Sequence, residues 1–339
     1  MRIAVDAMGG DNAPREVVAG TLLAASEFTD TEFILVGTEA AVQQELRKGK
    51  SGAVANVRVV HAPEVMGMED APVEALRGKR RSSVTVSVKL VADGEAEAVV
   101  SAGNTGGVVA AATVLLKPLS GVKRSGIAVS FPTHFGTTTI IDVGANIHCR
   151  PMHLLQYAVM ATVYSQQILN IAEPRVGLLN IGAESKKGNE LVRETRALLA
   201  EHPRINFVGN IEGNDIHSGV CDVAVCEGFV GNVILKVTEG MTASLFADVE
   251  EAFREAFPER DKEHLAALRA LRRRNDSAEY GGAPLLGVDG ICIIAHGSSG
   301  ARAIYNALRV ARGFGGKHVN EHIAKAIGAD CLTPPGKAK

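Results

Sequence analysis

The sequence predicts a three-layer α/β/α protein with a mostly parallel sheet and one projecting helical hairpin. Short β-branched apolar runs alternate with helical patterns, as expected of parallel strands joined by crossover helices. The runs are almost continuously apolar, as in strands buried on both faces. No internal repeat or linker divides the chain, so residues 1–339 are expected to form a single α/β domain.

Ten apolar runs are the expected strands. They are residues 3–5, 33–36, 57–60, 98–101, 127–130, 138–142, 175–180, 205–208, 222–226 and 291–295. The longest apolar stretch, 98–116, is interrupted by a glycine-rich polar segment at 101–107, so it is not expected to be a membrane helix.

Residues 240–280 lack any strand pattern and predict the hairpin insertion. Helical patterns cover 241–257 and 261–274 and meet at Pro258. Its apolar stripe either packs within the chain or forms a homodimer contact. The arginines of this hairpin form either a solvated face or a membrane-surface contact. The stripe and the arginines comprise Leu245, Phe246, Val249, Phe253, Phe257, Leu265, Leu268 and Leu271, and then Arg269 and Arg272 to Arg274.

Composition narrows the possible partners and the compartment. With 36 Lys and Arg against 38 Asp and Glu, the net charge of -2 gives no general attraction to nucleic acid, so no nucleic-acid partner is expected. The chain runs from Met1 directly into a predicted strand, without the pattern of a signal peptide, and we expect a cytoplasmic protein.

The five cysteines show no metal-binding spacing. They are Cys149, Cys221, Cys226, Cys292 and Cys331. A zinc pair at Cys221 and Cys226 is one interpretation, but small core residues fit the apolar context better. Cys149 follows His148 and could serve as a nucleophile, although adjacent residues need not face each other. We expect reduced thiols and no metal.

A glycine-rich turn at 101–107 follows the strand at 98–101 and precedes a predicted helix. Such a turn suits an oxyanion, because glycines let backbone N–H groups approach it and the helix N-terminus adds positive charge. Simple helix capping explains the same residue types equally well. The candidate phosphate ligands in this turn are Ser101, Gly103, Asn104, Thr105 and Gly106.

Similar glycine-rich and polar segments follow other predicted strands, where open parallel sheets bind ligands. We expect these segments to share one edge of the sheet. The further candidates for binding phosphate or substrate are Gly9, Gly10, Asp11, Asp142, Asn146, Asn180, Gly182, Glu184, Asn210, Glu212, Gly228 and Gly231. No nucleotide fingerprint and no G-x-S-x-G elbow is present, which disfavours a dehydrogenase, a kinase or a serine acyl-enzyme.

Several of these strings together resemble the PlsX family, the phosphate acyltransferases of bacterial phospholipid synthesis. The resemblance spans nearly the whole chain. It rests on the segments 6–11, 101–106, 142–146, 177–182, 226–232 and 281–287.

The resemblance implies a Rossmann-like fold related to phosphotransacetylases and isopropylmalate dehydrogenase. It also implies a homodimer that makes acyl phosphate from acyl-acyl carrier protein and inorganic phosphate, without a cofactor. The product would pass to a membrane glycerol-3-phosphate acyltransferase, and peripheral membrane association through the hairpin tip is implied. Here the tip, 254–264, is heavily charged, and His148 and Met152 stand where the family usually has carboxylates.

Phosphate attack on a thioester requires positioning and electrostatic stabilisation more than a protein nucleophile. We expect Lys187 to be a mobile cation for phosphate and Asn232 to donate to phosphate or an oxyanion. His296 is a candidate general acid, and the other interpretations are a solvated lysine and a structural histidine. An apolar groove along the hairpins would hold the acyl chain, and Arg269 to Arg274 would meet the acidic carrier protein.

Two other functions remain open. A phosphotransacetylase-like enzyme would use acyl-CoA and would share fold and chemistry. A non-catalytic scaffold would bind acyl chains or carrier protein, consistent with the two missing carboxylates. The intact loops favour an enzyme.

Overall fold

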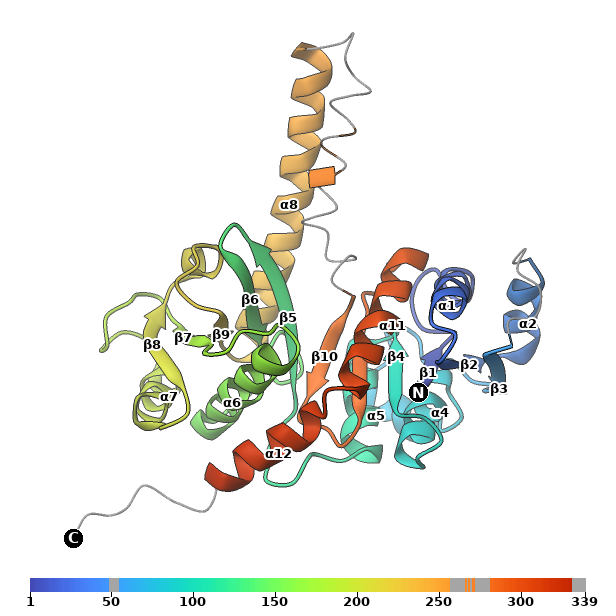
Figure 1. Ribbon diagram of the computed structural model, residues 1–339, viewed down its shortest axis with the longest axis horizontal. Helices are drawn as coiled ribbons and strands as arrows, with labels where there is room; N and C mark the ends of the chain where they lie inside the picture. The colour runs from blue at the N-terminus through green and yellow to red at the C-terminus, as the bar shows by residue number, and fades with distance from the viewer. Residues whose placement is uncertain (49–54, 257–265, 267, 269, 272–280, 331–339) are drawn as a thin grey trace.

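A single eleven-stranded sheet runs through the protein, as seen in a computed structural model (Figure 1). The structure describes residues 1–48, 55–256, 266, 268, 270, 271 and 281–330. The strands are β1 Arg2–Asp6, β2 Glu32–Gly37, β3 Val57–His61, β4 Ala98–Ser101, β5 Gly126–Thr133, β6 Gly136–Ile141, β7 Arg175–Leu179, β8 Asn206–Ile211, β9 Val223–Val225, β10 Ala283–Leu286 and β11 Ile291–Ile294. Their order in the sheet is β3-β2-β1-β4-β11-β10-β5-β6-β9-β7-β8.

Helices occupy both faces of this sheet. They are α1 Arg15–Glu27, α2 Glu39–Lys48, α3 Pro72–Gly78, α4 Ser83–Ala92, α5 Thr105–Leu115, α6 Pro151–Gln167, α7 Glu190–Glu201, η1 Gly213–His217, α8 Gly228–Ala256, α11 Ala301–Gly315 and α12 Val319–Asp330. Alternate residues of β1 belong to two separate cores. Ile3 and Val5 belong to one that includes side chains of α1, α6 and α11, and Ala4 belongs to one that includes side chains of α4 and α5. The predicted α/β/α layering is confirmed.

The parallel strands form two sets that run in opposite directions. One set is β3, β2, β1, β4 and β11, and the other is β6, β9, β7 and β8. Between them, β11 pairs with β10, β10 with β5 and β5 with β6, all antiparallel. Three reversals make the two sets antiparallel to each other, so their carboxyl ends leave opposite edges of the sheet. The expectation of one shared edge is wrong for this reason.

The helix α8 begins earlier than the sequence pattern predicts, at Gly228 instead of 241. Its first turn packs on the loop after β6, where Gly228 N–H donates to Asn146 O at 2.8 Å. A Cβ on Gly231 would lie 1.9 Å from the Asp142 carbonyl oxygen, so only glycine permits this approach. From there α8 extends well beyond the rest of the molecule (Figure 1).

The predicted hairpin is covered only in part. The second helical pattern, the arginine cluster and most of the tip lie outside the described residues, apart from helical residues 266, 268, 270 and 271. Cys331 also lies outside them. Within α8, Phe246, Val249 and Phe253 are half-buried but Leu245 is exposed, so the expected stripe divides between two faces. No described helix is long and apolar enough to cross a bilayer.

Candidate functional site

The loops that follow β1, β4 and β11 form the first loop group, and a buried carboxyl lies at its centre. Asp6, 2% exposed, accepts a hydrogen bond from Ser101 Oγ at 2.7 Å and another from Met8 N–H at 3.3 Å. Burial raises the pKa of Asp6. Ser101 Oγ in turn accepts from Gly103 N–H at 3.1 Å, so both side chains join the β1 loop to the β4 loop.

Glycines allow these two loops to touch. A Cβ on Gly9 would lie 2.5 Å from Asp6 Oδ2 and 2.7 Å from Gly103 N. Gly10 has φ +102° and packs against the Gly297 carbonyl, and the next residue, Asp11, donates its N–H to that same carbonyl at 2.8 Å. The predicted residues Gly9, Gly10, Asp11 and Gly103 are therefore brought together here.

Asn104 caps the N-terminus of α5. Its Oδ1 accepts from Gly107 N–H at 3.0 Å, and its Nδ2 lies 2.8–3.3 Å from the carbonyl oxygens of Gly67, Met68 and Asp70. Thr105 at the first helical position is exposed, and Gly106 packs under Pro72. Of this turn, the exposed Thr105 and the helix N-terminus are best placed to meet an anion.

The loops after β6, β9, β7 and β8 form the second loop group. Asp142 is fully buried, and burial raises its pKa against the opposing effect of four backbone N–H donors. Oδ1 accepts from the backbone N–H groups of Ile127, Gly144 and Ala145, and Oδ2 accepts from that of Asn146, at donor–acceptor distances of 2.7–3.1 Å. Asp142 therefore organises the loop on which α8 begins.

Asn146 is also engaged with the protein. Its Nδ2 donates to Ser125 O at 2.6 Å and to Tyr157 Oη at 2.9 Å, and its carbonyl accepts from Gly228. Together with Gly228 and Gly231, it fixes the start of α8. With Asp142, these three predicted residues form one contiguous cluster around the end of β6.

Lys187 lies on the loop after β7. Its Nζ is 3.0 Å from Glu184 Oε1, and its side chain is 49% exposed, so the cation can reach a ligand. Asn180 Nδ2 donates to the carbonyls of Gly182 and Lys187, which fixes the shape of the loop. Asn210 lies in β8 and donates to Glu184 O at 2.9 Å.

Glu212 directly follows β8. It donates its backbone N–H to Asp215 Oδ2 at 2.8 Å, which starts η1. Its side chain is exposed. It lies in the second loop group, as Asn180, Gly182, Glu184 and Lys187 do.

Asn232 and His296 come from different loop groups. Asn232 lies on the first turns of α8, where its side chain is about 3.8 Å from a Cβ placed on Gly144. His296 follows β11, with Nδ1 2.8 Å from Ser298 Oγ. Sequence reasoning missed the residue between them: Lys236 Nζ lies 2.9 Å from His296 Nε2. Its only signal was its position four residues after Asn232.

Burial favours the protonated thiol at three of the described cysteines. Burial raises the pKa of Cys149 to about 11 and that of Cys221 to about 12. Burial also raises the pKa of Cys226 well above its usual value. Among the described residues, no three His, Cys, Asp or Glu side chains gather as a metal site would require.

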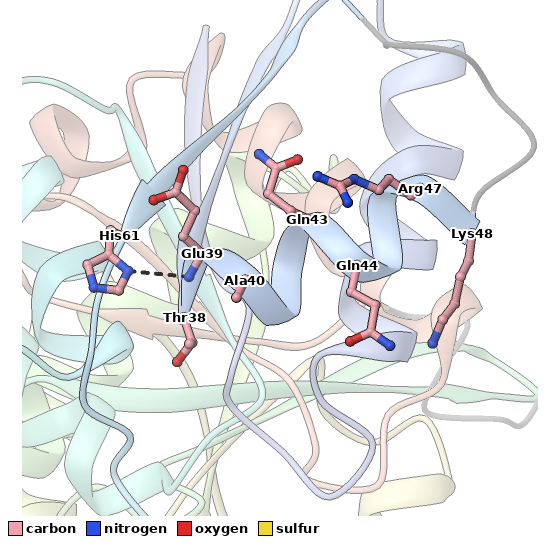
Figure 2. Close-up of a pocket in the computed structure, with 8 residues that line it drawn as sticks. All are labelled: Thr38, Glu39, Ala40, Gln43, Gln44, Arg47, Lys48 and His61. Carbon is pink, nitrogen blue, oxygen red and sulfur yellow. Dashed lines mark hydrogen bonds between the residues drawn. The ribbon is translucent and has the colours of Figure 1, made fainter.

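A hollow of about 780 Å³ lies along α2 at the β3 edge of the sheet (Figure 2). His61 Nδ1 accepts from Glu39 N–H at 3.3 Å beside it. Its lining is Thr38, Glu39, Ala40, Gln43, Gln44, Arg47, Lys48 and His61. No predicted site residue is among them, so the chemistry is not expected there.

Solved structures with this architecture define the class of fold. The EutD phosphotransacetylase from Staphylococcus aureus matches with a TM-score of 0.59 at 16% identity, covering 96% of this chain and 94% of its own. A phosphotransacetylase from Streptococcus pyogenes matches with a TM-score of 0.60 at 18% identity, covering 97% and 94%. The protein thus has the phosphotransacetylase type of α/β fold.

Closer relatives identify the family. The model of a family described as fatty acid synthesis protein matches residues 1–322. The phosphate acyltransferases of Desulforamulus reducens and Pelotomaculum thermopropionicum are 48% and 49% identical over 313 and 314 residues. These alignments cover 92% of this chain and 93% and 91% of theirs. The chain belongs to the phosphate acyltransferase (PlsX) family and is an acyltransferase.

Proposed function

We propose that this acyltransferase forms acyl phosphate reversibly from acyl-acyl carrier protein and inorganic phosphate, an early step of phospholipid biosynthesis. The observation that carries the proposal is the 48–49% identity to phosphate acyltransferases over 92% of the chain. The resemblance noted in the sequence supplies the carrier-protein donor. Residues of both loop groups would bind the two substrates.

The reaction needs no covalent enzyme intermediate. An oxygen of hydrogenphosphate attacks the thioester carbonyl, a C–O bond forms, the C–S bond breaks, and the phosphate proton ends on the departing thiol. Positioning the two reactants and stabilising negative charge are the protein's tasks. The high pKa of Cys149 supports this scheme, because a protonated thiol is a poor nucleophile.

Within this scheme the exposed Thr105 and the N-terminus of α5 would contact an oxyanion, and the cation Lys187 would approach from the β7 loop. Asn232 would donate to phosphate or to the carbonyl oxygen. The buried Asp6, Ser101 and Asp142 would act indirectly by fixing the loops. No step requires a metal or a cofactor.

The test is to incubate the purified protein with palmitoyl-acyl carrier protein, with and without phosphate, and to follow acyl phosphate by mass spectrometry. Product that requires phosphate and is formed from the carrier-protein donor supports the proposal. Preference for palmitoyl-CoA over palmitoyl-acyl carrier protein would favour the phosphotransacetylase-like alternative, to which the fold is equally suited. Acyl binding without phosphate-dependent cleavage would favour the scaffold.

We also propose a homodimer formed through α8. A row of apolar residues along this helix is exposed, and the exposed fraction of each residue lies between 45% and 69%. The row is Phe229, Val233, Val237, Met241 and Leu245, spaced four residues apart. Side chains four residues apart form a ridge that winds along a helix, and an exposed apolar ridge favours a partner. A second copy offers the same ridge.

Carrier-protein docking at Arg269 to Arg274 and peripheral membrane contact at the hairpin tip remain proposals. The protein would act in the cytoplasm and pass acyl phosphate to a membrane glycerol-3-phosphate acyltransferase.

At the described base of the tip, Arg254 pairs with Glu250 at 2.5 Å. Replacing the arginine cluster with glutamate should weaken carrier-protein binding, and unchanged binding would remove that part of the proposal.

A further inference from the structure

The helix α8 connects the two loop groups. It begins on the β6 loop and follows the short strand β9, so it runs back along the sheet toward the opposite edge. Eight residues of helix rise roughly 12 Å. At that distance from Gly228, Lys236 meets His296 at the end of β11, with 2.9 Å between Nζ and Nε2. This contact is where a side chain of α8 reaches the first loop group.

The hydrogen bonds of this contact define the roles of its groups. An ammonium has three N–H donors and no acceptor. Lys236 Nζ donates one to Glu239 Oε2 at 2.8 Å and one to His296 Nε2, which must then accept. On the other side of the ring, Nδ1 of His296 lies 2.8 Å from Ser298 Oγ and 3.3 Å from the Ser298 backbone nitrogen, so Ser298 holds the ring through Nδ1. One N–H of Lys236 remains for a ligand.

Lys236 is also positioned beside the predicted donor Asn232. The two residues are four apart on α8 and therefore neighbours on one helix face. Asn232 lies over Gly144 of the β6 loop, and the Lys236 side chain is 48% exposed. Asn232 thus offers an amide donor and Lys236 an ammonium, side by side and open to solvent. Loops of both loop groups flank them, and such a pair of donors suits an anion.

We propose that Lys236 binds the phosphate substrate, with His296 as the residue that positions its ammonium. This inference rests on the proposed function. Of the two substrates, phosphate is the dianion, so it gains more from an ammonium than a neutral thioester carbonyl does. In this arrangement His296 holds Lys236 in place through Nε2, and Ser298 holds His296 through Nδ1.

The test compares Lys236→Met with the wild-type enzyme. The KM for phosphate and the Kd for inorganic phosphate from calorimetric titration should both rise by about 10- to 100-fold, as expected for a lost charge-assisted hydrogen bond. The KM for the acyl donor should stay within about twofold. Lys236→Arg should recover part of the loss. Lys317→Met, at an exposed lysine after α11, is the matched control and should change neither constant.

The variant Ser298→Ala reports on the positioning role. It should raise the KM for phosphate by only about two- to fivefold, because His296 loses its fixed orientation but Lys236 remains. Thermal unfolding checks that each variant is folded, and Lys236→Gln replaces Lys236→Met if the latter does not fold.

The proposal is overturned if folded Lys236 variants bind phosphate as the wild type does, or if only the donor KM changes. Such a result in an enzyme that still makes acyl phosphate would leave the proposed function intact. Conversely, a wild-type enzyme that shows no phosphate-dependent cleavage of the thioester would refute the proposed function. The phosphate titration would still report on Lys236.

Discussion

At the scale of single residues, Asn104 uses both ends of its amide. Oδ1 caps α5 through Gly107 N–H, and Nδ2 reaches three carbonyls of the 67–70 segment. Asn104→Ala should lower the free energy of unfolding by about 1–2 kcal/mol, because the cap is lost. Urea denaturation measures this. Asn104→Ser keeps an acceptor for the cap and should lose less, and an alanine variant as stable as the wild type would contradict the assignment.

Cys149 is the second residue with a direct test. Its Sγ lies 3.6 Å from Asn146 O and 3.8 Å from Tyr157 Oη, and burial raises its pKa to about 11. At pH 8, about one thiol in a thousand is then ionised. Alkylation at Cys149, followed by peptide mass spectrometry, should therefore be slow at pH 8 and accelerate up to about pH 11. Half-maximal reactivity near pH 8.5 would show an activated thiol.

Residue type and position after a strand were sufficient to find the loops from the sequence. They were not sufficient to assign roles within them. Asp142 and Asn146 are polar residues after a strand, as ligands are, but their hydrogen-bonding groups are directed at the protein's own backbone. Whether such a side chain faces inward depends on contacts with distant segments, which local sequence does not record.

At the scale of elements, the exposed apolar row of α8 makes the sharpest prediction. Val237→Glu with Met241→Glu should convert the proposed dimer to monomers, because two carboxylates per copy would be buried in an apolar contact. Size-exclusion chromatography with light scattering measures the mass. Val114→Glu on α5, at a valine that is 60% exposed, is the control and should leave the mass unchanged. A wild-type monomer would remove the proposal.

The elements differ in how well the sequence specifies them. Long apolar strands such as β2 are evident from composition alone, whereas β10 has four residues, includes Pro284 and follows two glycines at positive φ. It was missed although it joins the two halves of the sheet. The start of α8 was also missed, because glycines such as Gly228 and Gly231 are typical of loops in a sequence. Here they allow α8 to pack closely on the residues that follow β6.

At the scale of the whole molecule, three antiparallel pairings separate two parallel sets of strands. The α/β class followed from the alternation of strands and helices, but the reversal could not, because pairing direction between distant strands leaves no local pattern. We propose a functional consequence: the site draws on loops at opposite edges of the sheet, with α8 extending from one edge toward the other.

In the proposed chemistry, phosphate itself cleaves the acyl thioester, without a protein nucleophile. Rapid mixing of the enzyme with palmitoyl-acyl carrier protein, with thiol and acyl phosphate measured together, tests it most directly. We predict no thiol release without phosphate, and one acyl phosphate per thiol when phosphate is present, in the wild type and in Cys149→Ala alike. A burst of thiol equal to the enzyme concentration in the absence of phosphate would reveal an acyl-enzyme and rule out direct attack by phosphate.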